Sequence, residues 1–581
     1  MASKTASLNT ILVLGLPICD GSSLYNTAAI VFKGKILAII PKSFIPNYAE
    51  FYERRHFKPC YDFGENKTIF VSKENPKVPF GTRILIKDSS NPLFALGIEL
   101  CEDLWVPHSP STDHALAGAT VIANLSGSNE IIGKASYRRT LVSAQSAKTV
   151  SAYIYANAGN DESTTDLVFS GHSILSENGS ILAESKLFEN SIQYADFDLE
   201  RIWHERYRTT TFADCAANLR DEYEMILVDL SENDNLNQST DEPENFTRRI
   251  ARTPFVPAGT TERNERCSEV IELQAQGLAK RLRHTHAKSA VIGLSGGLDS
   301  TLALLVTCRA FDLTGLERKQ IQAITMPCFG TTDRTYNNAC LLAKKTGATL
   351  SEVKIAESVR QHFKDIGHDE NVHDVTYENC QARERTQVLM DVANKTGGLV
   401  IGTGDLSEQA LGWATYNGDH MSMYGVNGSI PKTLVRYLVQ WFADEAEYNG
   451  DKELSSVLKD ILDTPVSPEL LPPDGKNIAQ KTESIVGPYE LHDFFLYYVL
   501  RFGFSPKKIL FPRGTCIHKA GRTPCLSTHR NKKMARIVLQ TFLRTAIQTK
   551  LYARQRKSRF GKSLASWRLE NAKRCFGCNV D

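Results

Sequence analysis

The sequence predicts an α/β protein with two layered domains, and two observations carry this prediction. Short β-rich runs such as TILVLGL, NTAAIVF and ATVIANL recur between polar turns over residues 10–223, a pattern typical of a layered α/β domain. After residue 262, strand and helix patterns alternate through AVIGL, IQAITM, ATLSEVKI and GGLVIGT. This alternation is typical of a doubly wound parallel sheet.

A polar segment separates the two predicted domains. Residues 230–261 are first acidic, then contain prolines, and hold no sustained apolar period. We therefore expect a first domain over 1–229, a linker over 230–261 and a second domain over 262–581.

The composition is that of an ordinary globular protein and disfavours several classes of partner. With 68 basic and 66 acidic residues the formal charge is +2, so no overall field holds the chain on nucleic acid or on an acidic membrane. The 13 cysteines lie without framework spacing, and neither a signal-peptide pattern nor a long apolar run is present. We expect a cytoplasmic protein with reduced thiols and with neither nucleic acid nor membrane as a partner.

The strongest motif is the glycine turn SGGLDST, at residues 295–301 between a predicted strand and a predicted helix. Two glycines allow backbone N–H groups to converge on phosphate oxygens at the positive end of the helix dipole. The serine and threonine hydroxyls can add further donors. The residues expected to bind ATP are Leu294, Ser295, Gly296, Gly297, Leu298, Asp299, Ser300 and Thr301.

Asp299 has a separate predicted role, because a carboxylate repels a phosphate. We expect it to hold a Mg²⁺ ion that bridges to the phosphates. The turn lacks the G-x-x-x-x-G-K-[ST] pattern of a Walker A loop, which favours cleavage between the α- and β-phosphates over kinase chemistry. The alternative is a glycine turn that merely joins a strand to a helix.

The SGGLDS turn resembles the pyrophosphate-binding motif of the N-type ATP pyrophosphatases, which adenylate an oxygen atom and let ammonia displace AMP. Alone, it does not separate NAD, GMP and asparagine synthetases. Three later stretches, which begin TYENCQARERTQ, GTGDLSEQALGW and SPELLPP, resemble the glutamine-dependent NAD synthetases in order and spacing. The resemblance runs from about Asn9 to Phe504, and it implies ATP-dependent amidation of deamido-NAD.

The resemblance implies further site residues in the second domain. Thr403 would contact ATP, and Glu408, which follows the strand LVIGTG, would complete a Mg²⁺ shell with Asp299. Lys432 would neutralise charge on the intermediate or on pyrophosphate, although a lone lysine is more often a solvated surface residue. The family usually has glycine where this chain has Cys328, in a loop expected near the adenine, so this chain adds a small thiol side chain at that place. The residues expected to contact deamido-NAD are Asn379, Glu408, Trp413, Ala414, Thr415, Tyr416 and Lys550.

The first domain resembles the amidase domain of the nitrilase superfamily, in GIELCEDLWVP, GKILAIIPKSFIPNYAEFYERRHF and ATVIANLSGS. In that superfamily a cysteine thiolate attacks the amide, a lysine stabilises the oxyanion and a glutamate transfers the proton. Cys101 matches the nucleophile and Lys42 the lysine, although a cysteine after an apolar strand is more often a core thiol. By the same resemblance, Tyr48, Ser128 and Lys134 would line the glutamine pocket. The implied fold is a nitrilase-like α-β-β-α sandwich followed by a Rossmann-like domain.

One member of the nitrilase triad has no counterpart in the sequence. The family glutamate lies upstream of the lysine, but no glutamate precedes Glu50 here. The family also carries further strands and helices before the segment that starts here at Asn9. We therefore expect an incomplete, N-terminally truncated amidase sandwich that barely hydrolyses glutamine, and a synthetase half that uses free ammonia.

Two rival functions stay open at this point. One is amidation of another nucleotide, and the other is a catalytically silent subunit that joins full-length copies. The resemblance also implies a homo-oligomer. The basic stretch RTAIQTKLYARQRKSRFGKS favours a solvated helix face or a subunit surface over RNA contact, and the pair Cys575 and Cys578 lacks the second pair that a structural zinc site requires.

Overall fold

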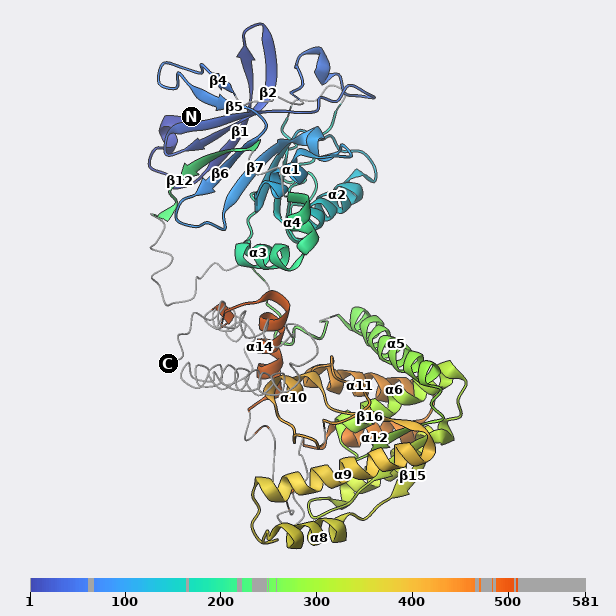
Figure 1. Cartoon of the computed structure of the whole chain (residues 1–581). Helices are drawn as coiled ribbons and strands as arrows, with labels where there is room; N and C mark the ends of the chain where they lie inside the picture. Colours follow the sequence, from blue (N-terminus) through green and yellow to red (C-terminus); the bar gives the residue numbers. More distant parts are fainter. Residues whose placement is uncertain are drawn as a thin grey trace. The chain divides into compact units, whose positions relative to one another are not determined.

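The computed structural model divides the chain into two compact units, Met1–Arg249 and Ile250–Asp581, which run from blue to green and from green to red in Figure 1. Lys550, the pair Cys575 and Cys578, and the basic C-terminal stretch lie outside the described residues. The structure describes residues 2–60, 67–162, 167–216, 222–231, 248, 250–257, 259–418, 420–465, 470–471, 483, 487–505 and 508–509.

The first unit is built on two sheets. The five-stranded sheet has the order β1-β2-β3-β5-β4, with bounds Leu12–Asp20, Ser23–Phe32, Lys35–Pro41, Val78–Phe80 and Lys67–Ile69 in that order. The seven-stranded sheet has the order β11-β10-β9-β8-β7-β6-β12. Its strands are β6 (Ile84–Asp88), β7 (Ala95–Leu100), β8 (Val121–Ser126), β9 (Ala152–Asn157), β10 (Ile174–Glu177), β11 (Ser180–Glu184) and β12 (Glu224–Val228).

Alternation along the strands explains how the two sheets pack. Ala28 and Ile30 of β2 share one core with Ile86 and Ile98 of the other sheet. Tyr25 and Ala29, whose side chains point the opposite way, belong to a separate core on the far face of the five-stranded sheet. The two sheets therefore pack face to face through their apolar sides.

Helices cover the outer face of the seven-stranded sheet. Val142 of helix α2 packs with Ile122 and Tyr153 in a core of its own. The helices of this unit are α1 (Pro110–Leu116), α2 (Lys134–Thr149), α3 (Leu199–Arg208) and α4 (Thr210–Ala216), with short 3-10 turns η1 (Ala2–Thr5), η2 (Glu53–Arg55) and η3 (Cys101–Leu104). This layering matches the predicted nitrilase-like fold.

The second unit is a parallel sheet in the order β15-β14-β13-β16-β17. The strands are β13 (Ser289–Gly293), β14 (Ile321–Thr325), β15 (Thr349–Glu352), β16 (Gly398–Gly402) and β17 (Tyr424–Gly425). The chain order reverses between β13 and β16, and ligands of doubly wound folds bind at the carboxyl ends of strands at such a point. The predicted Rossmann-like fold is confirmed.

Helices lie on both faces of this sheet (Figure 1). Ala290 and Ile292 of β13 face a core with α5, α6, α11 and α12, whereas Val291 faces a core with α8 and α9. The helices are α5 (Thr260–Thr285), α6 (Leu298–Thr314), α7 (Asp333–Thr346), α8 (Ala356–Ile366), α9 (Val375–Thr396), α10 (Leu406–Leu411), α11 (Lys432–Tyr448), α12 (Lys452–Leu462) and α14 (Tyr489–Phe502). Helix α5 thus begins within the residues expected to be linker.

Among the described residues, every helix is too short or too polar to cross a membrane.

Candidate active sites

The glycine turn after β13 has a conformation that requires glycine. Gly296 has a φ of +81°, and an added Cβ would lie 2.1 Å from the backbone oxygen of Thr335. The Ser295 hydroxyl accepts a bond from the Gly297 N–H at 3.2 Å, and the Thr301 hydroxyl donates to the Gly297 carbonyl at 2.8 Å. These bonds fix the shape of the turn at the N-terminus of α6.

The hydroxyls of the turn are partly engaged within it. Ser300 donates to the Gly297 carbonyl at 3.1 Å, the same oxygen that Thr301 uses. Both side chains are buried. Their role as donors to phosphate stays a prediction, while their structural role in closing the turn is evident from these bonds.

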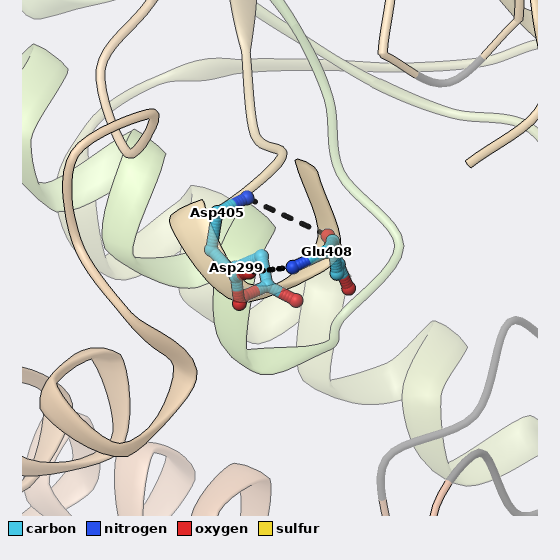
Figure 2. A group of neighbouring side chains, drawn as sticks. All are labelled: Asp299, Asp405 and Glu408. Carbon is cyan, nitrogen blue, oxygen red and sulfur yellow. Dashed lines mark hydrogen bonds between the residues drawn. The ribbon is translucent and has the colours of Figure 1, made fainter. Parts of the chain in front are cut away.

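Three carboxylates meet beside the turn. Asp299 lies in the first turn of α6, and Asp405 and Glu408 lie at the start of α10, which follows β16 (Figure 2). Because β13 and β16 are neighbouring parallel strands, their following loops reach the same edge of the sheet. One oxygen from each carboxylate lies within 4.8 Å of the others.

Local sequence explains how α10 presents two of these groups. Asp405 caps the helix, since its Oδ1 accepts a bond from the Glu408 N–H at 2.8 Å. Glu408 reaches back toward the Asp405 N–H at 3.5 Å, which completes a capping box. The cap holds both carboxylates on the side of the helix that faces Asp299.

Lys432, the first residue of α11, lies among the three carboxylates. Its ammonium is 2.7 Å from Asp299 Oδ2, 2.8 Å from Asp405 Oδ2 and 2.9 Å from Glu408 Oε1. The side chain is only 4% exposed, so the alternative of an ordinary surface lysine is wrong.

The charges of this cluster do not balance. Burial raises the pKa of Asp405 well above its usual range, with a further increase from the charge of Glu408, and burial raises the pKa of Glu408 to about 6. Burial alone would lower the pKa of Lys432, but the charges of the carboxylates raise it well above its usual value. With all groups ionised, three negative charges face one positive charge.

One oxygen of the cluster also lacks a partner. Asp299 Oδ1 is buried with no hydrogen-bond donor among the described residues. A divalent cation would satisfy this oxygen and neutralise the excess charge, and carboxylate oxygens are suitable ligands for Mg²⁺. The residues present therefore fit a magnesium ion.

Asn427, a buried residue after β17, joins the two loops of the site. Its Nδ2 donates to the backbone oxygens of Asp299 and Thr403, both at 3.0 Å. Thr403 and Asp299 were both predicted site residues, so this one amide side chain fixes the distance between the two loops that carry them.

The predicted dinucleotide residues form a second group next to the carboxylates. The Thr415 hydroxyl donates to Asn379 Oδ1 at 2.8 Å, and the Trp413 N–H donates to the backbone oxygen of Glu408 at 2.9 Å. Tyr416 is 51% exposed, and Ala414 is also exposed, as a surface for a ring would require. All these residues follow α10 or lie on α9.

Cys328 lies after β14, where its half-buried side chain packs against the core that contains Tyr377. Burial raises the pKa of its thiol. Its expected contact with adenine stays a prediction.

The first unit contains a cavity of about 690 Å³. The predicted residues Cys101, Tyr48, Ser128 and Lys134 all line it, together with Glu50, Glu53, Glu102 and aromatic side chains such as Trp105. The structure thus brings the predicted nucleophile and the predicted glutamine residues to one place. Since Cys101 is half-buried and lines the cavity, the core-thiol alternative is wrong.

Cys101 lies at a sharp turn directly after β7. Its φ is +46°, an uncommon value for a residue with a side chain, and its N–H donates to Asn124 Oδ1 at 3.1 Å. The buried Asp103 carboxylate accepts from the Leu100 N–H at 3.0 Å and from the Phe44 N–H at 2.8 Å. These bonds hold the strained turn, and they tie it to the segment that carries Lys42.

Lys42 is buried, with 2% of its side chain exposed, and its ammonium lies 2.5 Å from Glu53 Oε2. Lys134 lines the cavity, 5.3 Å from the centre of the Trp105 ring. Burial lowers the pKa of Lys134, and the charge of Cys101 acts on it in the opposite direction. The thiol therefore has a cationic neighbour within electrostatic reach.

Comparisons with known proteins identify the family. The family model described as NAD synthase matches residues 270–505, and the one described as carbon-nitrogen hydrolase matches residues 1–207. The glutamine-dependent NAD(+) synthetase of Mycobacterium tuberculosis is 44% identical over 521 residues, which cover 88% of this chain and 75% of that protein. This chain belongs to the glutamine-dependent NAD(+) synthetase family.

Two further relatives are less similar. The glutamine-dependent NAD(+) synthetase of Thermotoga maritima is 29% identical over 87% of this chain and 78% of that protein. A crystal structure of a glutamine-dependent NAD(+) synthetase from Cytophaga hutchinsonii aligns over 92% of this chain and 79% of that one, with 19% identity and a TM-score of 0.38. The predicted family is confirmed by the sequence relatives.

Three residues of these candidate sites were not predicted from the sequence. Asp405 carried a signal, because an aspartate three residues before a glutamate at a helix start predicts a capping box. Asn427 and Glu53 carried no local signal. Each acts through a residue from another element of the fold, and such contacts appear only once the elements are packed.

Proposed function

We propose that this chain amidates deamido-NAD to NAD with ATP, releasing AMP and pyrophosphate, at the carboxylate and lysine cluster of the second unit. The observation that carries the proposal is the position of this cluster. Asp299, Asp405, Glu408 and Lys432 lie beside the glycine turn, at the edge of the sheet where the strand order reverses. The names of the relatives support the same reaction.

In the proposed reaction, the nicotinate carboxylate attacks the α-phosphate of ATP and becomes adenylated. The backbone N–H groups of the glycine turn and the dipole of α6 orient the phosphates. Lys432 stabilises negative charge that develops on the departing pyrophosphate. Ammonia then attacks the activated carbon and AMP leaves.

Asp299 and Glu408, joined by Asp405, would hold Mg²⁺ in this proposal. When bound, the ion supplies charge neutralisation and orients the phosphates. Asn379 and the 413–416 run would position deamido-NAD, and Thr403 would contact ATP.

We propose that the first unit supplies ammonia. Cys101 would attack the amide carbon of glutamine, Lys42 would stabilise the oxyanion, and Tyr48, Ser128 and Lys134 would bind the substrate. From the sequence alone, free ammonia is the expected nitrogen source, so the nitrogen donor is the variable to test. A cytoplasmic homo-oligomer is proposed from family resemblance, and the free thiols of the described residues fit a reducing compartment.

The test is NAD formation from deamido-NAD and Mg-ATP, with ammonium or glutamine supplied in parallel. Activity with ammonium, and AMP rather than ADP as product, is the expected result. Asp299→Asn should remove it, whereas Asp312→Asn on the same helix, which loses only a surface pair with Arg318, should not. No NAD from ammonium would favour the silent-subunit alternative, and amidation of a different nucleotide in place of deamido-NAD would favour the other rival.

A further inference from the structure

Helix α14 brings a buried carboxylate to the starts of α10 and α11, the two helices that carry most of the charged cluster. Asp493, near the start of α14, is 1% exposed. Its Oδ2 accepts bonds from the Thr433 N–H at 2.7 Å and from the Thr433 hydroxyl at 2.6 Å, and its Oδ1 accepts one from the Ser407 hydroxyl. One carboxylate therefore binds two helices, one through each oxygen.

Ser407 joins these two helices directly. It lies between Asp405 and Glu408 in the first turn of α10, and its oxygen accepts a bond from the Lys432 N–H at 2.9 Å. A serine hydroxyl has a single proton to donate, and because Asp493 accepts it, the oxygen is left as the acceptor for the Lys432 N–H. The backbone of Lys432 is thus bonded to the same turn of α10 that carries two of the carboxylates around its ammonium.

These contacts replace a cap that α11 lacks. The residue before the helix is Pro431, which makes no side-chain capping bond, although the first N–H groups of a helix need partners from outside it. Ser407 supplies a partner for the Lys432 N–H, and Asp493 supplies one for the Thr433 N–H. The start of α11 is therefore placed by side chains of α10 and α14, and not by its own sequence.

The position of this helix start matters because of the residue that occupies it. The N-terminus of a helix carries a partial positive charge, which disfavours a cation there, yet Lys432 is the first residue of α11. Three carboxylates at 2.7–2.9 Å offset this repulsion, and the ring of Tyr489, at the start of α14, lies 5.3 Å from the ammonium. These contacts hold only if the starts of α10, α11 and α14 keep their places.

We infer that Asp493 is a positioning residue for the amidation, an inference that rests on the function proposed for the cluster. By holding Ser407 and Thr433 together, it fixes the distance between the Lys432 ammonium and the two carboxylates of α10. It thereby fixes the place available to a Mg²⁺ ion and to pyrophosphate, and it acts through its neighbours rather than on the substrate. A displacement of about 1 Å in such a site can lower the rate by about 10²-fold.

The first test is Asp493→Asn, a substitution of nearly equal size. An amide group has one acceptor oxygen where a carboxylate has two, so the Ser407 hydroxyl and the Thr433 N–H cannot both keep an acceptor. At saturating substrates, NAD formation from ammonium per folded molecule should fall by about tenfold to 10²-fold, and the Mg²⁺ concentration for half-maximal rate should rise severalfold. A purely structural role would lower the folded fraction and leave both quantities unchanged.

Ser407→Ala tests the same link without a change of charge. It removes the bond to Asp493 and the acceptor of the Lys432 N–H, so NAD formation and the Mg²⁺ requirement should change in the same directions as in Asp493→Asn. In the double variant, the loss should be close to that of the larger single variant, because effects of residues that act through one bond do not add.

The matched control is Asp88→Asn in the first unit. Asp88 is a buried carboxylate that also accepts bonds from a serine hydroxyl, Ser90 at 2.9 Å, and from a backbone N–H, Leu230 at 3.2 Å. Its substitution makes the same chemical change outside the second unit, so NAD formation from ammonium and the Mg²⁺ requirement should stay as in the unmodified chain. Circular dichroism on each sample gives the folded fraction to which the rates are referred.

Several results would overturn the inference. One is a rate per folded molecule and a Mg²⁺ requirement in Asp493→Asn equal to those of the unmodified chain. If that variant does not fold, the same result for Ser407→Ala decides against the inference. Losses that multiply in the double variant, or an equal loss in Asp88→Asn, would also contradict it. No NAD from ammonium by the unmodified chain would instead contradict the proposed function itself.

Discussion

Among the described residues, each unit buries one lysine beside carboxylate groups, but the two lysines have different numbers of carboxylate partners. Lys42 contacts Glu53, which gives a pair with no net charge. Lys432 contacts three carboxylates, which gives a cluster with two excess negative charges. A pair with no net charge suits a site for an uncharged amide, whereas a cluster with excess negative charge suits a divalent cation and phosphate chemistry. The chemistry of a buried lysine therefore depends on the charge around it.

Of the substitutions proposed below, removal of the Lys432 charge should have the largest effect on stability and on NAD formation. Lys432→Met leaves three carboxylates with no cation, including the fully buried Asp405. Loss of one partner of a buried ion pair costs about 3–5 kcal/mol, so the free energy of unfolding of the second unit should fall by that order. NAD formation from ammonium should fall by roughly 10²–10⁴-fold, if a similar free energy is lost from the transition state.

The control is Lys459→Met, which removes an exposed lysine paired with Glu447. It should change the free energy of unfolding by less than about 1 kcal/mol and leave NAD formation unchanged. Both substitutions are measured by urea unfolding and by NAD formation. Equal effects would show that the buried cluster contributes no more to stability or activity than the exposed pair.

The second largest effect should come from a change in the backbone of the glycine turn beside the cluster. Gly296→Ala adds a Cβ at 2.1 Å from the backbone oxygen of Thr335, at a φ of +81°, so the turn must move. We expect a loss of roughly 10²-fold in NAD formation, with a higher KM for ATP, because displaced phosphate contacts reduce both binding and alignment.

Gly315→Ala is the matched control. Gly315 has a φ of +73°, yet an added Cβ there meets no atom within 4 Å. It should cost about 1 kcal/mol of stability, as a residue in the left-handed region does, and leave the KM for ATP unchanged. A similar KM in both variants would mean that the turn does not touch ATP.

The sequence predicted the parts of the fold and of the sites that depend on local pattern. The short β-rich runs before residue 223 and the strand and helix order after residue 262 predicted the fold class, because such patterns reflect which elements form and which faces are buried. The glycine turn was predictable since close backbone approach demands glycine. Cys101 and Lys42 were found from resemblance alone.

The missed contacts join elements that are far apart in the sequence. Asn427 bonds to the backbone near Asp299, which lies 128 residues away. Glu53 pairs with Lys42 across a strand end and a loop, and nothing in the run NYAEFYERR distinguishes Glu53 from Glu50. Such contacts depend on how strands are ordered in the sheet, and periodicity does not specify that order.

The third largest effect tests the negative charge of Asp405 separately from its role as the N-cap of α10. Asp405→Asn keeps a good N-cap residue for α10, but it removes one negative charge from the cluster around Lys432. Because fewer charges then attract the ion, the Mg²⁺ concentration needed for half-maximal NAD formation should rise by about tenfold, the effect of ~1.4 kcal/mol. Asp374→Asn, at the exposed N-cap of α9, makes the same change without the cluster and should leave the Mg²⁺ requirement unchanged. An unchanged requirement in Asp405→Asn would contradict the cation site.

The smallest predicted effect is a loss of stability of the first unit at acidic pH. Burial lowers the pKa of His114 to about 4. Its ring nitrogens contact the Ile98 oxygen and the Tyr223 hydroxyl, both at 2.9 Å. In the unfolded chain its pKa is about 6.5, so the unfolded state binds the proton first. The stability that neutral His114 contributes is present above pH 6.5 and is lost as the pH falls toward 4.

At pH 5 this loss should amount to about 2 kcal/mol relative to pH 7.5. Asp103 acts in the opposite direction, because burial raises its pKa to about 7 and its folded form takes up a proton as the pH falls. His114→Phe removes only the first contribution, so the Asp103 effect cancels when variant and unmodified chain are compared. Urea unfolding of both at pH 7.5 and pH 5 should show a smaller acid loss in the variant. Equal losses would mean that His114 titrates alike in the folded and unfolded chain, and that its buried contacts do not hold it neutral.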